Sequence, residues 1–317
     1  MANDIWHRTL SRRAMLRAAG VGGLAAVTAA CTGGTQPKPP PSPGTIRFLR
    51  HGAEQLSLLT GLGDKPADAI QTGKSTYICD LSSGPTSLLQ GGTPQVYFAK
   101  SMSSKAIGPF PMQWDLFTGY EKTGDTSPKS PIPGIFWGEI DVPTAGTWIT
   151  AAVAKDGAKT GVGIAGAIVS DQVIHPVGEK ATSVPTPVAT SPAGIAKICT
   201  RVPVDHMHYI SLDDALTNGK PTVVSFATPK FCTSQLCGPV VDEQILVFEK
   251  FGRDKANFIH VEEFPTQDVS VQSPPFVAWK LHSEPWVFVI DKAGVIRARF
   301  LGPAVAPMIE AALNPLL

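Results

Sequence analysis

The sequence predicts a multidomain chain, in which an all-β sandwich precedes a smaller α/β domain. Its 317 residues exceed one average domain, and 43% of them are hydrophobic, which is enough for two cores. Between residues 45 and 175, short apolar runs are broken by Gly, Pro, Ser and Asp, as in an antiparallel sandwich. From residue 201 to residue 317, strand-like runs alternate with helix-like runs, which indicates an α/β layer.

The charge balance argues against some classes of partner. The formal net charge is +1, so no strong field attracts nucleic acid, and we expect no nucleic-acid partner. The five cysteines are too few for a disulfide scaffold in a chain of this length. Each cysteine therefore needs its own explanation.

Residues 1–31 have the organisation of an export signal. A basic segment ends at Arg12-Arg13, and a run of small apolar residues extends from Ala18 to Ala30. This run corresponds to roughly 20 Å of helix, which is too short for a bilayer core of about 30 Å. The stretch from Ser11 to Arg17 resembles the twin-arginine motif of exported bacterial proteins.

The end of this signal predicts a lipid anchor. Cys31 follows Thr28-Ala29-Ala30, which resembles a bacterial lipobox, in which the cysteine is acylated. Residues 32–44 are rich in proline and are typical of an extended tether. We therefore expect a chain anchored by lipid at the extracytoplasmic face of the cell membrane. The alternative is cleavage near Ala30 and release of a soluble protein.

The expected sandwich covers residues 45–175. Its clearest strands are Gln95 to Ala99, Gly134 to Ile140 and Thr147 to Val153. At the level of fold it resembles the immunoglobulin-like modules of bacterial envelope proteins. Residues 176–200 contain several prolines and little to bury, so they predict a linker to the last domain, residues 201–317.

The last domain carries a cysteine pair in a recognisable setting. A strand precedes Cys232, a helix follows Cys237, and Glu284-Pro285 precedes a hairpin and a closing helix. This order resembles the thioredoxin superfamily over roughly residues 205–317. The resemblance implies an envelope thiol–disulfide oxidoreductase without a cofactor, acting on an envelope protein that has a disulfide or thiol. It also implies Cys232 as the nucleophile, Cys237 as the resolving thiol and Pro285, the family's cis-proline, as part of the partner groove.

The spacing of the two cysteines departs from that family, because four residues separate them instead of two. Five positions of regular helix give about 7.5 Å of rise, beyond the roughly 7 Å between Cα atoms that a disulfide allows. The segment between Cys232 and Cys237 must therefore be non-helical when the bond is present. One group of peroxiredoxins has the same spacing, but Ser225 and Pro229 stand where those enzymes have proline and Thr or Ser.

Two further interpretations of the pair stay open. SCO-type copper chaperones bind copper through two cysteines and a histidine, and His282 stands near the corresponding position, so Cys232, Cys237 and His282 are alternative copper ligands. The run Asp205-His206-Met207-His208 could add ligands, although such short clusters usually lie on the protein surface without a metal-binding role. The other interpretation is a non-catalytic interaction protein with a structural disulfide.

The remaining groups give weaker indications. A Cys79–Cys199 bridge between the two domains is a hypothesis, because free thiols are uncommon outside the cytoplasm. We interpret Glu262-Glu263 and Asp213-Asp214 as solvent-exposed surface residues and not as catalytic carboxylates.

Overall fold

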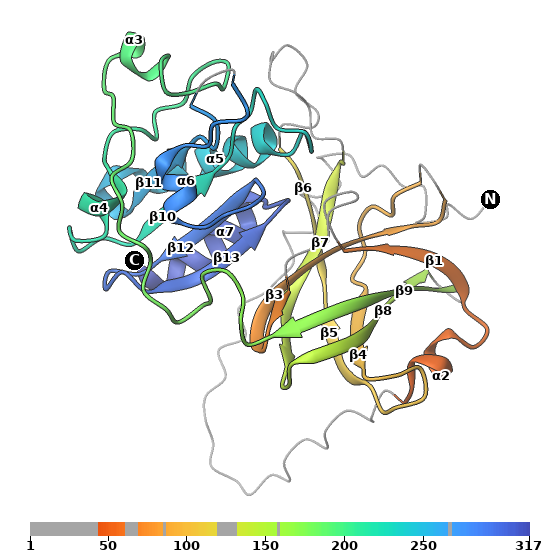
Figure 1. Ribbon diagram of the computed structural model, residues 1–317. Coiled ribbons are helices and arrows are strands. Elements are labelled where there is room, and N and C mark those ends of the chain that lie inside the picture. Colours follow the sequence, from red (N-terminus) through yellow and green to blue (C-terminus); the bar gives the residue numbers. More distant parts are fainter. Residues whose placement is uncertain (1–43, 61–68, 85–86, 119–131, 157–158, 266–267) are drawn as a thin grey trace, which may run out of the picture.

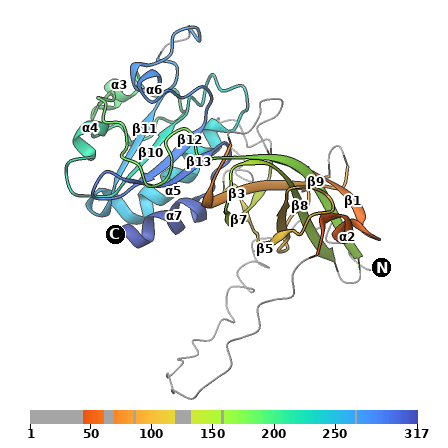
Figure 2. The same ribbon diagram turned by 60° about the horizontal axis from the view of Figure 1, so that its bottom comes forward.

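The computed structural model describes residues 44–60, 69–84, 87–118, 132–156, 159–265 and 268–317. The expected export signal, Cys31 and nearly all of the tether lie outside the described residues. The described chain forms two sheets, a large one from its first half and a small one from its second half, which lie side by side (Figures 1 and 2).

The large sheet is mixed and nearly closed, like a barrel. Its strands are β1 (Glu54–Leu59), β2 (Ile70–Gln71), β3 (Gly73–Ser82), β4 (Gln95–Ala99), β5 (Ile107–Pro111), β6 (Gln113–Leu116), β7 (Gly134–Val142), β8 (Gly146–Asp156) and β9 (Lys159–Ser170). The main path runs β5-β4-β8-β9-β1-β3-β7-β6, and β2 pairs with β9. β1 and β2 pair with β9 in parallel, and the other pairs are antiparallel.

Glycines in β7 allow the sheet to curl toward closure. A Cβ atom at Gly138 would lie 2.4 Å from the backbone oxygen of Pro111, at the end of β5. A Cβ atom at Gly134 would lie 2.3 Å from the oxygen of Asp115 in β6. Only glycine therefore lets β5 and β6 approach β7 this closely.

The small sheet has the order β11-β10-β12-β13. It consists of β10 (Thr222–Phe226), β11 (Asn257–Val261), β12 (Trp286–Ile290) and β13 (Ile296–Leu301). β10 and β11 are parallel, whereas β12 is antiparallel to both β10 and β13. The described helices are α2 (Ile46–Arg50), α3 (Pro192–Ile195), α4 (Leu212–Ala215), α5 (Cys237–Lys255), α6 (Pro274–Ala278), α7 (Ala306–Leu313) and the 3-10 turn η2 (Asn314–Leu316).

The two faces of the small sheet are covered differently. On one face, side chains such as Val223 and Val289 pack with residues of α5 and α7. On the other face, Phe226 and Phe288 pack with α4, α6 and the buried Trp279. α4 and α6 are four and five residues long, so irregular chain supplies much of the second cover.

The structure corrects the predicted fold class. Strands account for 36% of the structure and helices for 20%, and the large sheet is one barrel-like sheet, not the two sheets of an immunoglobulin-like sandwich. No thioredoxin-like α/β domain is evident in the described residues, whose six α-helices are short apart from α5. The thioredoxin-like fold expected for residues 205–317 is therefore wrong. The physical reason is that alternating apolar residues show which side of a strand is buried, but not which sheet covers it.

Contacts join the two parts of the chain. Glu243 on α5 is fully buried, and its carboxyl oxygens accept the N–H groups of Thr118 at 2.6 Å and Ala306 at 2.8 Å. β3 lies next to β13 (Figure 1). None of the helices in the described ranges has the length and apolar character that a membrane crossing requires.

Candidate functional site

Cys232 and Cys237 form a disulfide whose Cα atoms are 6.0 Å apart. α5 begins at Cys237, and the residues from Cys232 to Leu236 form turns instead of helix. The expectation of a non-helical segment between the two cysteines is confirmed. Cys237, not Cys232, therefore occupies the first helical position.

The two sulfur-bearing residues differ in access to solvent. Cys232 is partly exposed, whereas Cys237 is 0% exposed and belongs to the core beneath α5. The Cys232 sulfur lies 3.1 Å from the hydroxyl oxygen of Ser234, which is within hydrogen-bond distance. A partner thiol can thus approach Cys232, but it cannot approach Cys237 without displacing core residues.

A carboxyl group lies beside the disulfide. One oxygen of Glu284 and the two cysteine sulfurs all lie within 4.8 Å of one another. Burial, followed by the charge of Glu263, raises the pKa of Glu284 to about 8, and a contact with Thr228 opposes this shift only in part. Glu284 is therefore mostly a neutral acid at pH 7, next to the sulfurs.

The other residues implicated by the sequence lie as follows. Pro285 is buried directly before β12, and the Glu284–Pro285 peptide bond is cis. His282 is exposed and is not part of the close group formed by the sulfurs and Glu284. The sequence analysis named Glu284 only because it precedes Pro285 and did not predict a role for its carboxyl group. An ionisable residue next to the expected cis-proline was the signal that could have indicated this role.

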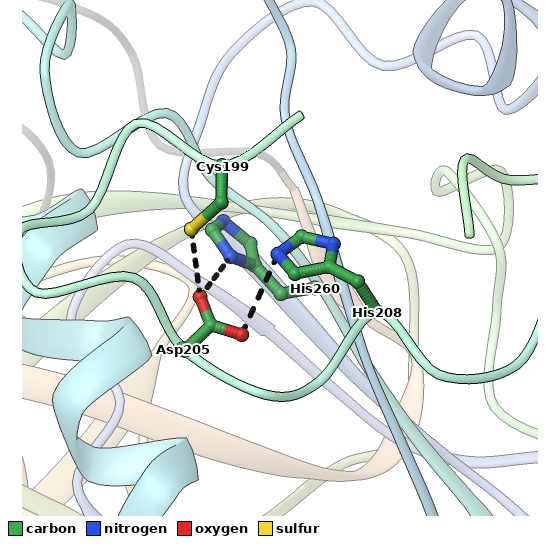
Figure 3. Close-up of side chains that lie close together, drawn as sticks. All are labelled: Cys199, Asp205, His208 and His260. Carbon is green, nitrogen blue, oxygen red and sulfur yellow. Dashed lines mark hydrogen bonds and ion pairs between the residues drawn. The ribbon is translucent and has the colours of Figure 1, made fainter. Parts of the chain in front are cut away.

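A second cluster consists of Cys199, Asp205, His208 and His260, all of them buried (Figure 3). The expectation that the run containing Asp205 and His208 is surface is wrong for both of these residues. Burial would raise the pKa of Asp205, but the neighbouring His260 lowers this pKa well below its usual range. The carboxyl group of Asp205 is therefore ionised. His260 had a signal in the sequence, as a polar residue within the buried strand β11.

Two other expectations are corrected. Cys79 and Cys199 are both free, so the hypothetical bridge between them is absent. Glu262 and Glu263 are buried instead of solvated. Glu262 accepts hydrogen bonds from the backbone and the hydroxyl of Thr200, at 2.6 and 2.8 Å.

Comparisons with protein-family models and with curated proteins find no match to this sequence. The function must therefore be argued from the geometry of the two clusters.

Proposed function

We propose that the chain is an exported, lipid-anchored protein of the bacterial envelope that exchanges its Cys232–Cys237 disulfide with another envelope protein. One observation carries the proposal: a partly exposed cysteine is bonded to a fully buried one, with a mostly neutral carboxyl group beside both. The twin-arginine-like segment and the lipobox-like Cys31 support the location at the extracytoplasmic face of the membrane.

The first step uses Cys232, the partly exposed cysteine. In the reduced protein, the Cys232 thiolate attacks one sulfur of a partner disulfide, since the thiolate is the nucleophilic form. The second partner sulfur leaves as a thiolate and takes a proton from water. Cys232 and the partner are then joined by a mixed disulfide.

The second step uses the buried sulfur and Glu284. The ionised fraction of Glu284, which is small at pH 7 and reaches about half near pH 8, takes the proton of the Cys237 thiol, and the resulting thiolate attacks the sulfur of Cys232. The bond between Cys232 and the partner breaks, and the departing partner thiolate takes the proton from Glu284. Two electrons have moved from the cysteine pair to the partner, and the same steps in reverse oxidise a partner dithiol.

The test is disulfide exchange by the full chain, measured as reduction of insulin and as equilibration with glutathione. Cys232→Ser should abolish exchange, and Cys237→Ser should accumulate a mixed disulfide with glutathione, because the resolving thiol is gone. Cys79→Ser, which alters a buried free thiol in β3, is the matched control and should leave the rate unchanged.

Two results would contradict the proposal. One is a Cys232–Cys237 bond that stays closed in the folded protein under excess dithiothreitol, which would make it a structural crosslink. The other is a Cys232→Ser protein with the exchange rate of the unaltered chain.

A further inference from the structure

The buried cluster of Cys199, Asp205, His208 and His260 gathers four side chains that bind metal ions. Cys199, Asp205 and His208 belong to the irregular chain between α3 and α4, and His260 lies on β11. Backbone contact holds this segment against the strand, because the His260 N–H donates to the oxygen of Met207 at 2.9 Å. Figure 3 shows that Cys199, His208 and His260 all contact the carboxyl group of Asp205.

The distances suit a tetrahedral centre. One donor atom from each of the four residues lies within 4.8 Å of the other three. The Cys199 sulfur is 3.2 Å from Asp205 Oδ2, and His208 Nε2 is 3.5 Å from Asp205 Oδ1. Metal bonds of 2.0–2.3 Å in a tetrahedral zinc site place neighbouring donor atoms about 3.3–3.7 Å apart. The Cys199–Asp205 distance is close to this range, and the His260 Nδ1–Asp205 Oδ2 distance of 2.8 Å has to widen when a metal ion binds.

The surroundings orient the donor atoms. His260 Nε2 lies 2.8 Å from the backbone oxygen of Ala227, and only a protonated Nε2 can donate to a carbonyl. Nδ1 faces the cluster and lies 2.8 Å from Asp205 Oδ2, to which it donates its proton; loss of that proton would free the Nδ1 lone pair for a metal ion. Asp205 Oδ1 accepts the N–H of Met207 at 2.9 Å. In metal sites, a ligating histidine typically donates its other N–H to a carbonyl, and a ligating carboxylate is itself hydrogen-bonded, which fixes the orientation of both ligands.

One potential metal-binding atom of the cluster, His208 Nε2, has no hydrogen-bond partner in the part of the chain that the structure describes. The side chain of His208 is 1% exposed, and its Nε2 atom makes no hydrogen bond within the described residues, although Asp205 is close enough for an ion pair. A buried polar atom without a hydrogen bond has a free-energy cost, because it has lost its contacts with water. Coordination of a metal ion by Nε2 would remove this cost.

We propose that Cys199, Asp205, His208 and His260 form a four-coordinate Zn²⁺ site that fastens the 199–208 segment to β11. The donor set of one thiolate, one carboxylate and two neutral imidazoles carries two negative charges, which balance Zn²⁺ and make a buried centre neutral. All four positions are filled by protein, as in structural zinc sites, which leave no open position for a substrate. The site shares no residue with the disulfide and stands whether or not the proposed exchange function does.

The test is titration of the full chain with Co²⁺, which reports tetrahedral thiolate sites by its visible absorption. The protein stays oxidised, so that Cys232 and Cys237 cannot bind the metal through their sulfurs. We expect one equivalent of Co²⁺ to bind, with a sulfur-to-cobalt charge-transfer band, and one equivalent of Zn²⁺ to displace it. Cys199→Ser should remove the charge-transfer band, and His208→Ala should lower the affinity at least about tenfold.

Two control variants make the result specific. His206→Ala alters an exposed neighbour of the proposed ligands, and Cys79→Ser alters the other free thiol of the described residues. Both should bind Co²⁺ like the unaltered chain. Absence of a charge-transfer band in the unaltered protein would overturn the proposal, whether or not any variant folds. A band that persists in Cys199→Ser and disappears in Cys79→Ser would also overturn it.

Discussion

The raised pKa of Glu284 predicts a specific dependence of stability on pH. In the folded chain the carboxyl group keeps its proton up to about pH 8, whereas an exposed glutamate releases it near pH 4.5. Between these values the folded state binds more protons than the unfolded state, so the free energy of unfolding falls as pH rises. At 1.36 kcal/mol per pH unit, the interval corresponds to roughly 4–5 kcal/mol.

The perturbation is Glu284→Gln, which keeps a neutral side chain of the same shape at every pH. We expect the free energy of unfolding of the variant to match that of the unaltered chain near pH 4.5. At pH 8 and above, the variant should be more stable by up to roughly 4–5 kcal/mol. The assay is urea unfolding followed by tryptophan fluorescence from pH 4 to 9, with the disulfide kept oxidised.

Glu249→Gln is the matched control, because it makes the same change at an exposed position of α5. The difference in the free energy of unfolding between Glu249→Gln and the unaltered chain should not grow with pH over this range. If Glu284→Gln gives the same flat difference, Glu284 is not a buried neutral acid, and its role beside the sulfurs is refuted. In the exchange assay, loss of Glu284 should also lower the rate near pH 8 by about 100-fold and remove the rise in rate centred near that pH.

Two further predictions concern the fold. Gly138→Ala in β7 should lower the free energy of unfolding by about 1–3 kcal/mol, because the new Cβ meets the Pro111 oxygen, whereas Gly166→Ala, in open space on β9, should change it by less than about 0.5 kcal/mol. Equal effects of the two changes in urea unfolding would refute the close approach. Glu243→Ala should cost roughly 2–5 kcal/mol by leaving two backbone N–H groups without a partner, and Glu249→Ala on the same helix should cost almost nothing. A thermal unfolding midpoint for Glu243→Ala equal to that of Glu249→Ala would contradict this role.

Local features of the sequence were sufficient to predict several individual elements. The helix expected after the second cysteine is present and extends from Cys237 to Lys255. The strand from Gln95 to Ala99 has the expected bounds. Such elements depend on apolar periodicity and on turn residues close in sequence, so the sequence itself contains the information. The five-residue separation of the cysteines likewise required a non-helical connection, since helical rise is a local property.

Tertiary structure alone decided the features that join distant residues. The parallel pairing of β1 with β9 turns the first half of the chain into a nearly closed sheet, and alternation within each strand is the same in a sandwich and a barrel. The carboxyl group of Glu284 reaches the sulfurs, and Cys199 meets His260, only because irregular segments fold back against the small sheet. The sequence by itself determined where each strand and helix could form and which side of it avoids water. Which elements pair, and which polar groups meet in the interior, depended on packing the whole chain, because these contacts are set by three-dimensional distance and not by sequence spacing.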